Sequence, residues 1–226
     1  VQLVLLEQFA SALGDPGRGQ GRLKVFRVGP PRALSRLLPM LTSRGVEVID
    51  ERPYVLEGLA RQSYIYEFGL RHTGNLPATG KDLFAQALRA VWDGYNEIDG
   101  FNRLVLAAGL TWRQATVLRA YAKYLRQGNS PFALDYIHGA LREHADITRL
   151  LIDLFDARFD PGRDGLPADA EARTARVEMI EDKLARALDD VVSLDHDRIL
   201  RSYLTLIQAT LRTNFFQRSS DGGVHP

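Results

Sequence analysis

The amino-acid sequence predicts an α+β protein in which a β-α-β-β-α module is followed by an all-α helical bundle. Two observations support this division. Strand and helix patterns alternate up to about residue 98, and nearly every later segment has the spacing of an amphipathic helix. The 226 residues are 45% hydrophobic and 25% charged, which is typical of a folded chain with a substantial core.

The composition also excludes several classes of protein. There is no cysteine, so disulfides, a thiol nucleophile and cysteine-ligated zinc are excluded. The net charge of +1 gives no reason to expect a nucleic-acid partner. The longest apolar run, Leu104–Leu110, is far shorter than the roughly 20 residues of a membrane helix. We therefore expect no nucleic-acid and no membrane partner. Because no export signal opens the sequence, we also expect a cytoplasmic location.

Residues 1–20 are expected to form a leader and a glycine-rich linker. Gln2–Leu6 has the composition of a short strand, and a helical turn could follow it. The glycine-rich stretch from Gly14 to Gly21 resembles a phosphate-binding loop, but such a loop must follow a strand and open a helix. Because this stretch precedes a strand, we predict no nucleotide site there.

The module is predicted to occupy residues 21–98. Leu23–Val28 is its first strand, and Pro31 suits the first position of the helix that follows, whose last turn ends before Gly45. Two further strands, at 46–52 and 63–70, form an antiparallel hairpin. One face of the second strand carries a row of large apolar side chains: Tyr64, Tyr66, Phe68 and Leu70.

The last helix of the module begins near Thr79 or Gly80 and carries apolar residues at helical spacing as far as Tyr95. Its Gly80-Lys81 pair is not a nucleotide-binding P-loop, because Asp82 stands where such a loop has serine or threonine. The order β-α-β-β-α is most of a ferredoxin-like βαββαβ unit.

The strand that would close this unit has two candidates, Gln2–Leu6 and Arg103–Gly109. We favour a helix for the second segment because Asp99 and Gly100 can form a turn before it and its alanines favour helix.

The helical bundle is predicted over residues 99–217, with 218–226 as a disordered tail. Successive apolar stripes need partners, so the helices must pack on one another. Predicted helix starts are Thr111 as a cap, Ser130 followed by Pro131, and Asp195 as the cap of a last helix that reaches Phe215.

No catalytic, cofactor-binding or metal-binding residue can be found from these patterns. His138 and His144 are too far apart in sequence to share a helix face, and no His-Glu-x-x-His motif is present. The run Asp195-His196-Asp197 resembles a ligand cluster, but consecutive helical residues point in different directions, and a helix cap explains the aspartate more simply. No Gly-x-Ser-x-Gly nucleophile motif occurs.

Several long segments resemble the large bacterial NAD-specific glutamate dehydrogenases. They are Val48–Tyr54, Ile65–Leu70, Asp99–Arg113, Leu118–Gln127 and Asp197–Gln217. The resemblance implies that this chain is a fragment of such an enzyme. It implies an ACT-like fold for the module and a helical region that ends just before the catalytic domain. The family's substrate motifs and dinucleotide fingerprint are absent, so no catalytic residue is carried over.

The resemblance also implies the partners and one possible ligand site. The parent enzyme uses NAD to oxidise L-glutamate, and this fragment would contact its own catalytic domain and neighbouring subunits. ACT modules often bind amino acids at the loop between the first strand and first helix, which here contains Gly29 and Arg32. Pro30 and Pro31 remove two backbone donors from that loop. We therefore expect a non-catalytic regulatory or scaffolding fragment; the alternative is an amino-acid-binding sensor with a helical output.

Overall fold

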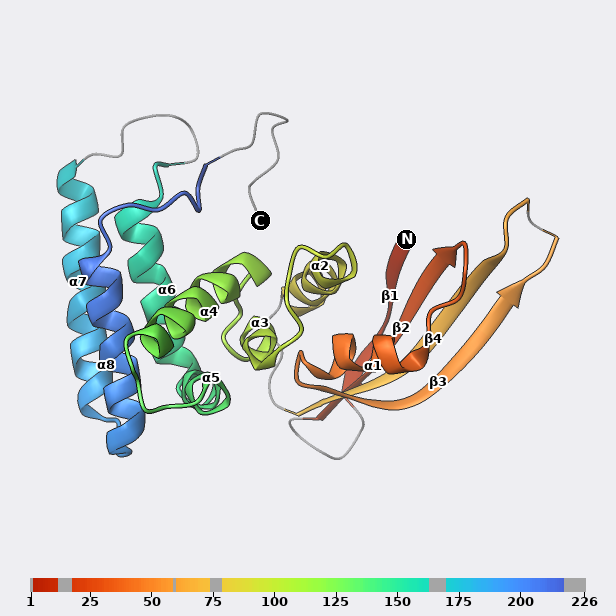
Figure 1. Ribbon diagram of the computed structural model, residues 1–226, viewed down its shortest axis with the longest axis horizontal. Helices are drawn as coiled ribbons and strands as arrows, with labels where there is room; N and C mark the ends of the chain where they lie inside the picture. Colours follow the sequence, from red (N-terminus) through yellow and green to blue (C-terminus); the bar gives the residue numbers. More distant parts are fainter. Residues whose placement is uncertain (1, 12–17, 59, 74–78, 163–169, 218–226) are drawn as a thin grey trace. The chain divides into compact units, whose positions relative to one another are not determined.

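The computed structural model describes residues 2–11, 18–58, 60–73, 79–162 and 170–217. The chain forms two compact units, Val1–Ala115 and Thr116–Pro226, which are described separately below. The first unit contains a β-sheet with helices, and the second is helical (Figure 1). The described residues therefore form an α+β protein, as the sequence predicts.

Where the structure describes the first unit, its sheet has four strands in the order β1-β2-β4-β3, and all neighbours are antiparallel. The strands are β1 (Gln2–Ser11), β2 (Arg18–Val28), β3 (Val46–Leu56) and β4 (Ser63–Thr73). The predicted hairpin between β3 and β4 is confirmed, with Val46 opposite His72.

The outer position beside β2 is filled by β1, one of the two candidates for the closing strand. Gln2 pairs with Phe26 and Ser11 with Gly19, with an irregularity between Leu6 and Ala10. The predicted helical turn after Leu6 is therefore wrong, and so is the linker as far as it covers residues 18–21, which already belong to β2. The remaining linker residues, 12–17, lie outside the described residues. The reason for the error is that β1 and β4 pair with the glycine-containing stretch from both sides and hold it extended.

Two helices, α1 (Leu34–Thr42) and α2 (Gly80–Trp92), cover the same face of the sheet (Figure 1). The apolar row predicted on β4 faces them: Phe68 and Leu70 are buried, and Tyr64 is half-buried against the same cluster. The core also takes side chains from β2, from both helices and from the short helix α3 (Leu104–Ala107). These are Leu23, Val25, Leu37, Met40, Leu41, Phe84, Leu88, Val91, Trp92 and Leu106.

The start of α1 differs from the prediction. The helix begins at Leu34, with Ala33 as its N-cap, rather than at Pro31. The preceding loop is held in a non-helical conformation by two hydrogen bonds. The Gly29 N–H bonds the Gln62 carbonyl at 2.9 Å, and the Arg32 N–H bonds the Tyr66 hydroxyl at 2.9 Å.

The strand β3 continues past Pro53 to Leu56. This is compatible with proline because β3 pairs only with β4 in the sheet and lies at its edge, where a missing N–H breaks no second ladder.

The segment predicted as helical rather than as the closing strand forms a 3-10 turn, η1 (Gly100–Arg103), and then α3 (Leu104–Ala107). Asp99 caps the turn by accepting a hydrogen bond from the Phe101 N–H at 3.0 Å. Ala87, Val105 and Ala115 form a small buried cluster in this unit. This packing places the boundary between the compact units after Ala115, whereas the sequence suggested a division near residue 98.

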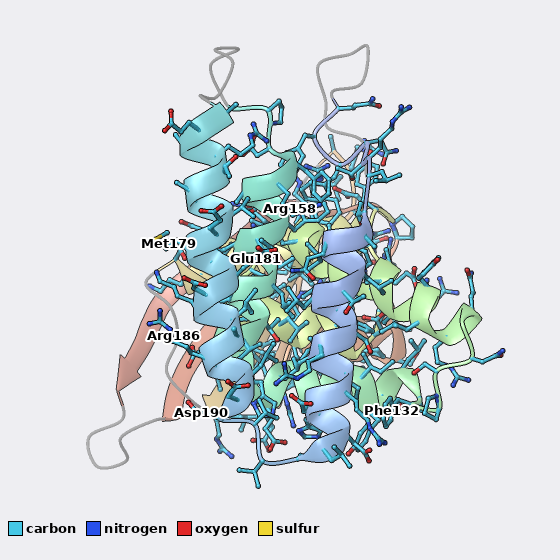
Figure 2. All side chains as sticks on the ribbon, turned by 90° about the vertical axis from the view of Figure 1, so that its left-hand side faces the viewer. Phe132, Arg158, Met179, Glu181, Arg186 and Asp190 are labelled. Carbon is cyan, nitrogen blue, oxygen red and sulfur yellow. The ribbon has the colours of Figure 1, made fainter. Side chains whose placement is uncertain are left out.

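The described residues of the second unit form five helices: α4 (Trp112–Gln127, which begins in the first unit), α5 (Leu134–Glu143), α6 (Ala145–Phe159), α7 (Ala170–Asp189) and α8 (Leu194–Ala209). The longest, α7, buries only a narrow stripe formed by Ile180, Leu184 and Leu188. Its outer surface carries exposed side chains such as Met179 and Arg186 (Figure 2). In the described residues, no helix is both long and apolar enough to cross a membrane.

The predicted helix starts are only partly correct. Thr111 does cap α4, because its Oγ1 accepts from the Gln114 N–H at 3.2 Å while the Gln114 Oε1 accepts from the Thr111 N–H at 3.0 Å. By contrast, α5 starts after Ala133 rather than at Ser130 and Pro131.

The last helix also differs at both ends. Ser193, not Asp195, caps α8, and the helix ends at Ala209 rather than at Phe215. Beyond it, Phe215 and Phe216 pack on Phe155 of α6, at centroid distances of 5.5 and 6.1 Å, so this segment folds back on the bundle. The predicted tail, 218–226, lies outside the described residues.

Candidate functional site

The loop between β2 and α1 contains the two residues predicted to bind an effector. Gly29 has a φ of +106°, a conformation that L side chains rarely adopt, and no heavy atom lies within 4 Å of the position a Cβ would take. Arg32 lies in the same loop, and its guanidinium carbon is 4.6 Å from the centre of the Trp92 ring. Arg27 approaches this ring too, at 5.8 Å. The tryptophan is thus a cation–π platform for two arginines.

The backbone donors of this loop are already used. The N–H groups of Gly29 and Arg32 bond the Gln62 carbonyl and the Tyr66 hydroxyl, respectively, and Pro30 and Pro31 have none. A carboxylate at residues 29–32 would find the Arg32 guanidinium as a donor but no free backbone N–H. Effector binding at Gly29 and Arg32 therefore stays a prediction.

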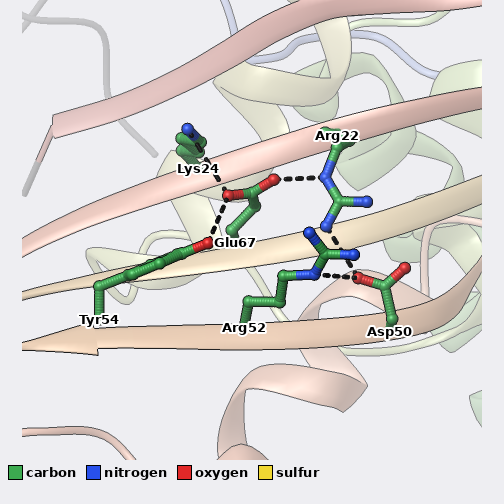
Figure 3. Close-up of polar contacts among 6 residues, drawn as sticks. All are labelled: Arg22, Lys24, Asp50, Arg52, Tyr54 and Glu67. Carbon is green, nitrogen blue, oxygen red and sulfur yellow. Dashed lines mark hydrogen bonds and ion pairs between the residues drawn. The ribbon is translucent and has the colours of Figure 1, made fainter.

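A polar network lies on the sheet face opposite the helices (Figure 3). At its centre is Glu67 of β4, whose carboxylate accepts from Arg22 Nε, lies 3.5 Å from Lys24 Nζ and accepts from the Tyr54 hydroxyl at 3.4 Å. These partners come from β2 on one side and β3 on the other. The Glu67 side chain, only 10% exposed, therefore ties three strands together.

The second carboxylate of the network belongs to Asp50, which bonds Arg22 Nη2 at 2.9 Å. A register shift between Val48 and Asp50 places Asp50 opposite Gly69. A Cβ at Gly69 would lie 2.5 Å from Asp50 Oδ2, so the glycine gives the carboxylate room to reach across β4 to β2.

The electrostatics of this network stabilise its charged forms. The Arg22 hydrogen bond lowers the pKa of Glu67, and Glu67 with Asp50 raises the pKa of Arg22. Local sequence patterns do not predict this network because its members are far apart in sequence, with Arg22 and Glu67 separated by 45 positions. The only sequence signal is the alternation of charged with apolar residues along β2 and β4.

A pH prediction follows for the Glu67→Gln variant. Because the folded pKa of Glu67 is lowered, its contribution to stability is present above the ordinary glutamate pKa and is lost as the pH falls through the lowered value. We expect Glu67→Gln to remove this part of the acid destabilisation in denaturant titrations over a series of pH values. Glu47→Gln is the matched control, because Glu47 pairs with Arg71 at 3.1 Å with a side chain that is 66% exposed. Equal acid dependence in Glu67→Gln and the unmodified chain would contradict the prediction.

The described part of the glycine-rich stretch, residues 18–21, does not fit NAD. Gly19 and Gly21 lie inside β2, opposite His72 and Leu70 of β4. A dinucleotide needs glycines in a turn between a strand and a helix N-terminus, where N–H groups face the pyrophosphate. These glycines instead belong to a sheet ladder.

Of the three histidines considered above, the structure brings His144 and His196 together and leaves His138 apart from them. His138 Nε2 lies 3.1 Å from Asp135 Oδ1 on the same helix. His144 and His196 come together, with their Nε2 and Nδ1 atoms 3.2 Å apart. The flanking aspartates of His196 are not part of this pair: Asp195 and Asp197 are paired with Arg198 and Arg201 of α8.

Family models match three successive parts of the chain. Residues 8–83 match "Glutamate dehydrogenase, ACT3 domain", and residues 96–161 match "Glutamate dehydrogenase, helical motif 3". Residues 183–226 match "Bacterial NAD-glutamate dehydrogenase, catalytic domain". The last match corrects one expectation. We expected the chain to stop before the catalytic region, yet the end of α7 and the whole of α8 lie within that model.

Curated relatives agree with these models. The chain is 43% identical over 210 residues to the NAD-specific glutamate dehydrogenase of Mycobacterium tuberculosis and 39% identical over 203 residues to that of Halomonas elongata, covering 88% of this chain in both cases. The Pseudomonas aeruginosa enzyme of the same name is 40% identical over 210 residues, or 91% of this chain. The chain spans only 12–13% of the length of these relatives. The sequence therefore belongs to the bacterial NAD-specific glutamate dehydrogenase family and corresponds to one segment of its members.

Proposed function

We propose that this chain is a non-catalytic regulatory and scaffolding segment of an NAD-dependent glutamate dehydrogenase. The complete cytoplasmic enzyme would oxidise L-glutamate to 2-oxoglutarate and ammonia and pass the hydride to NAD. In this proposal the sheet unit is an ACT-like module, and the helical unit joins the module to the catalytic domain. Its partners are that domain and neighbouring subunits.

The observation that carries the proposal is the packing of α8 within the helical unit. This helix lies in the catalytic-domain match, whereas α4 to α6 lie in the match to helical motif 3. Tyr203 of α8 is fully buried and donates a hydrogen bond to the Leu118 carbonyl of α4 at 2.9 Å. The Tyr121 hydroxyl of α4 lies 2.8 Å from Thr210 Oγ1. The two matched segments thus share one core, and a displacement of one is resisted by the other.

The occupied donors of the β2–α1 loop support scaffolding over amino-acid sensing. The loop's Gly29 and Arg32 N–H groups donate hydrogen bonds to the carbonyl of residue 62 and the hydroxyl of residue 66, respectively. The Arg32 guanidinium lies over the Trp92 ring. These contacts fix the loop to the sheet and to α2. They favour a rigid module that packs on its neighbours.

The proposal is tested first by activity. The 226-residue chain, mixed with L-glutamate and NAD, is expected to form no NADH, whereas the complete dehydrogenase assayed in parallel forms it. Glutamate-dependent NADH formation by the chain alone would overturn the non-catalytic assignment.

Amino-acid binding gives a second test and addresses the alternative of a sensor. Calorimetry of the chain with a panel of amino acids is expected to show no saturable heat. If one amino acid does bind, Gly29→Val is compared with Gly58→Val, because both glycines have positive φ and open space at the Cβ position. Binding that Gly29→Val abolishes and Gly58→Val preserves would replace scaffolding by sensing at this loop.

A further inference from the structure

We propose that Glu143, His144 and His196 form a binding site for a divalent transition-metal ion of the Zn²⁺ class. One ligand atom from each residue lies within 4.8 Å of the others, the one such group of three among the described residues. The site lies entirely in the helical unit, where the end of α5 meets the first turn of α8.

The local structure holds the two imidazoles in place. His144 is the single residue between α5 and α6, with φ −105° and ψ 57°, and the α5–α6 corner is braced by the buried Thr148, whose hydroxyl donates to the Leu141 carbonyl at 2.7 Å. His196 lies in the first turn of α8, where its backbone N–H donates a hydrogen bond to the Ser193 hydroxyl at 3.4 Å. The Tyr136 ring packs edge-on against His196 at 5.5 Å.

The nitrogen positions suit a tetrahedral ion. Two imidazole nitrogens bound at about 2.0–2.1 Å in tetrahedral geometry stand roughly 3.3 Å apart. His144 Nε2 and His196 Nδ1 are 3.2 Å apart. Without an ion, one of these nitrogens must donate a hydrogen bond to the other; with an ion, both present lone pairs and the N–H moves to the far side of that ring.

The carboxylate supplies the third ligand. Glu143 Oε1 is 4.0 Å from His196 Nδ1, and the Glu143 side chain is 68% exposed, so a rotation of this long side chain brings the oxygen into the coordination sphere. Water completes four-coordination. Two imidazoles and one carboxylate favour Zn²⁺, Co²⁺ or Ni²⁺ over Ca²⁺ and Mg²⁺, which prefer all-oxygen sites.

A metal ion at this site would link two segments that match different family models. Glu143 and His144 lie in the helical-motif match and His196 in the catalytic-domain match, 52 positions further along the chain. A bound ion would fix the N-terminus of α8 to the α5–α6 corner. An ion that binds only the folded unit also raises its thermal midpoint.

The test is a competition titration of Zn²⁺ between the tag-free 226-residue chain and a chromophoric chelator. We expect one ion per chain and a loss of affinity of about tenfold or more in His144→Ala and in His196→Ala. His138→Ala is the matched control and is expected to bind like the unmodified chain, because His138 lies outside the cluster. The Co²⁺ form should show the intense visible absorption of a four-coordinate site.

Folding is monitored separately by circular dichroism, and His196→Gln provides a milder variant if His196→Ala does not fold. Failure to bind Zn²⁺ would overturn the proposal. Equal affinity in the His138→Ala and His196→Gln variants would also overturn it, because the ion would then be held elsewhere.

Discussion

Replacing Tyr203 with alanine is expected to lower the free energy of unfolding of the helical unit by about 3–5 kcal/mol. The ring is completely buried and lies edge-on to Tyr121 at 6.3 Å, and its hydroxyl bonds the Leu118 carbonyl. The substitution leaves a cavity where α8 packs on α4. Urea denaturation followed by circular dichroism measures the loss.

Two controls separate the contributions of the Tyr203 side chain. Tyr203→Phe keeps the ring and removes one hydrogen bond, so it should cost about 0.5–1.5 kcal/mol. Tyr124→Ala, on the same α4 helix that Tyr203 contacts, removes a tyrosine that is 60% exposed and should change stability by less than about 0.5 kcal/mol. Equal losses for Tyr203→Ala and Tyr124→Ala would contradict the packing described for α8.

Replacing Arg44 with methionine is expected to stabilise the sheet unit by about 1–3 kcal/mol. Arg44 has no exposed surface, and its Nη2 donates to the Ala87 carbonyl at 2.6 Å. Among the described residues, its Nε and Nη1 atoms have no hydrogen-bond partner. Arg44 is thus a buried guanidinium that forms no ion pair with a described carboxylate, and a methionine of similar length fills the space without a charge.

The pH dependence tests the same idea independently. Burial lowers the pKa of Arg44 to about 9, far below the ordinary arginine value. As the pH rises above about 9, the folded state releases this proton before the unfolded state does, so Arg44 makes stability increase with pH. Arg44→Met should lack this increase. Arg89→Met, at a side chain that is 69% exposed, should change stability little at any pH. A destabilised Arg44→Met variant would show that the Ala87 hydrogen bond outweighs the buried charge.

Local periodicity predicted much of the fold. The alternation along β4 identified the row from Tyr64 to Leu70, and the structure confirms that this row faces the core. The capping of α4 by Thr111 could also be predicted from the sequence. Thr111 and Gln114 stand at the spacing at which the side chain of each accepts a hydrogen bond from the backbone N–H of the other. In both cases the deciding interactions lie within a few residues of one another.

Interactions between residues far apart in the chain could not be predicted from the sequence. The position of β1 depends on hydrogen bonds to β2, and the glycines of that stretch suggested flexibility until the flanking strands held them extended. The start of α1 shifted because Tyr66, more than 30 positions away, captures the Arg32 N–H. The His144–His196 contact was missed for the same reason: a spacing rule within one helix says nothing about partners on another helix.

The N-terminal position of β1 determines where this unit can be cut. The match to the ACT3 model begins at residue 8, inside β1, and ends at residue 83. It therefore excludes Val105 and Leu106, which belong to the buried clusters of this unit. A piece excised at those limits would keep only part of β1 and would leave much of the edge of β2 open to pairing with another chain. A piece from Gln2 to Ala115 retains the full ladder and both clusters, so expression of the sheet unit alone should use these ends.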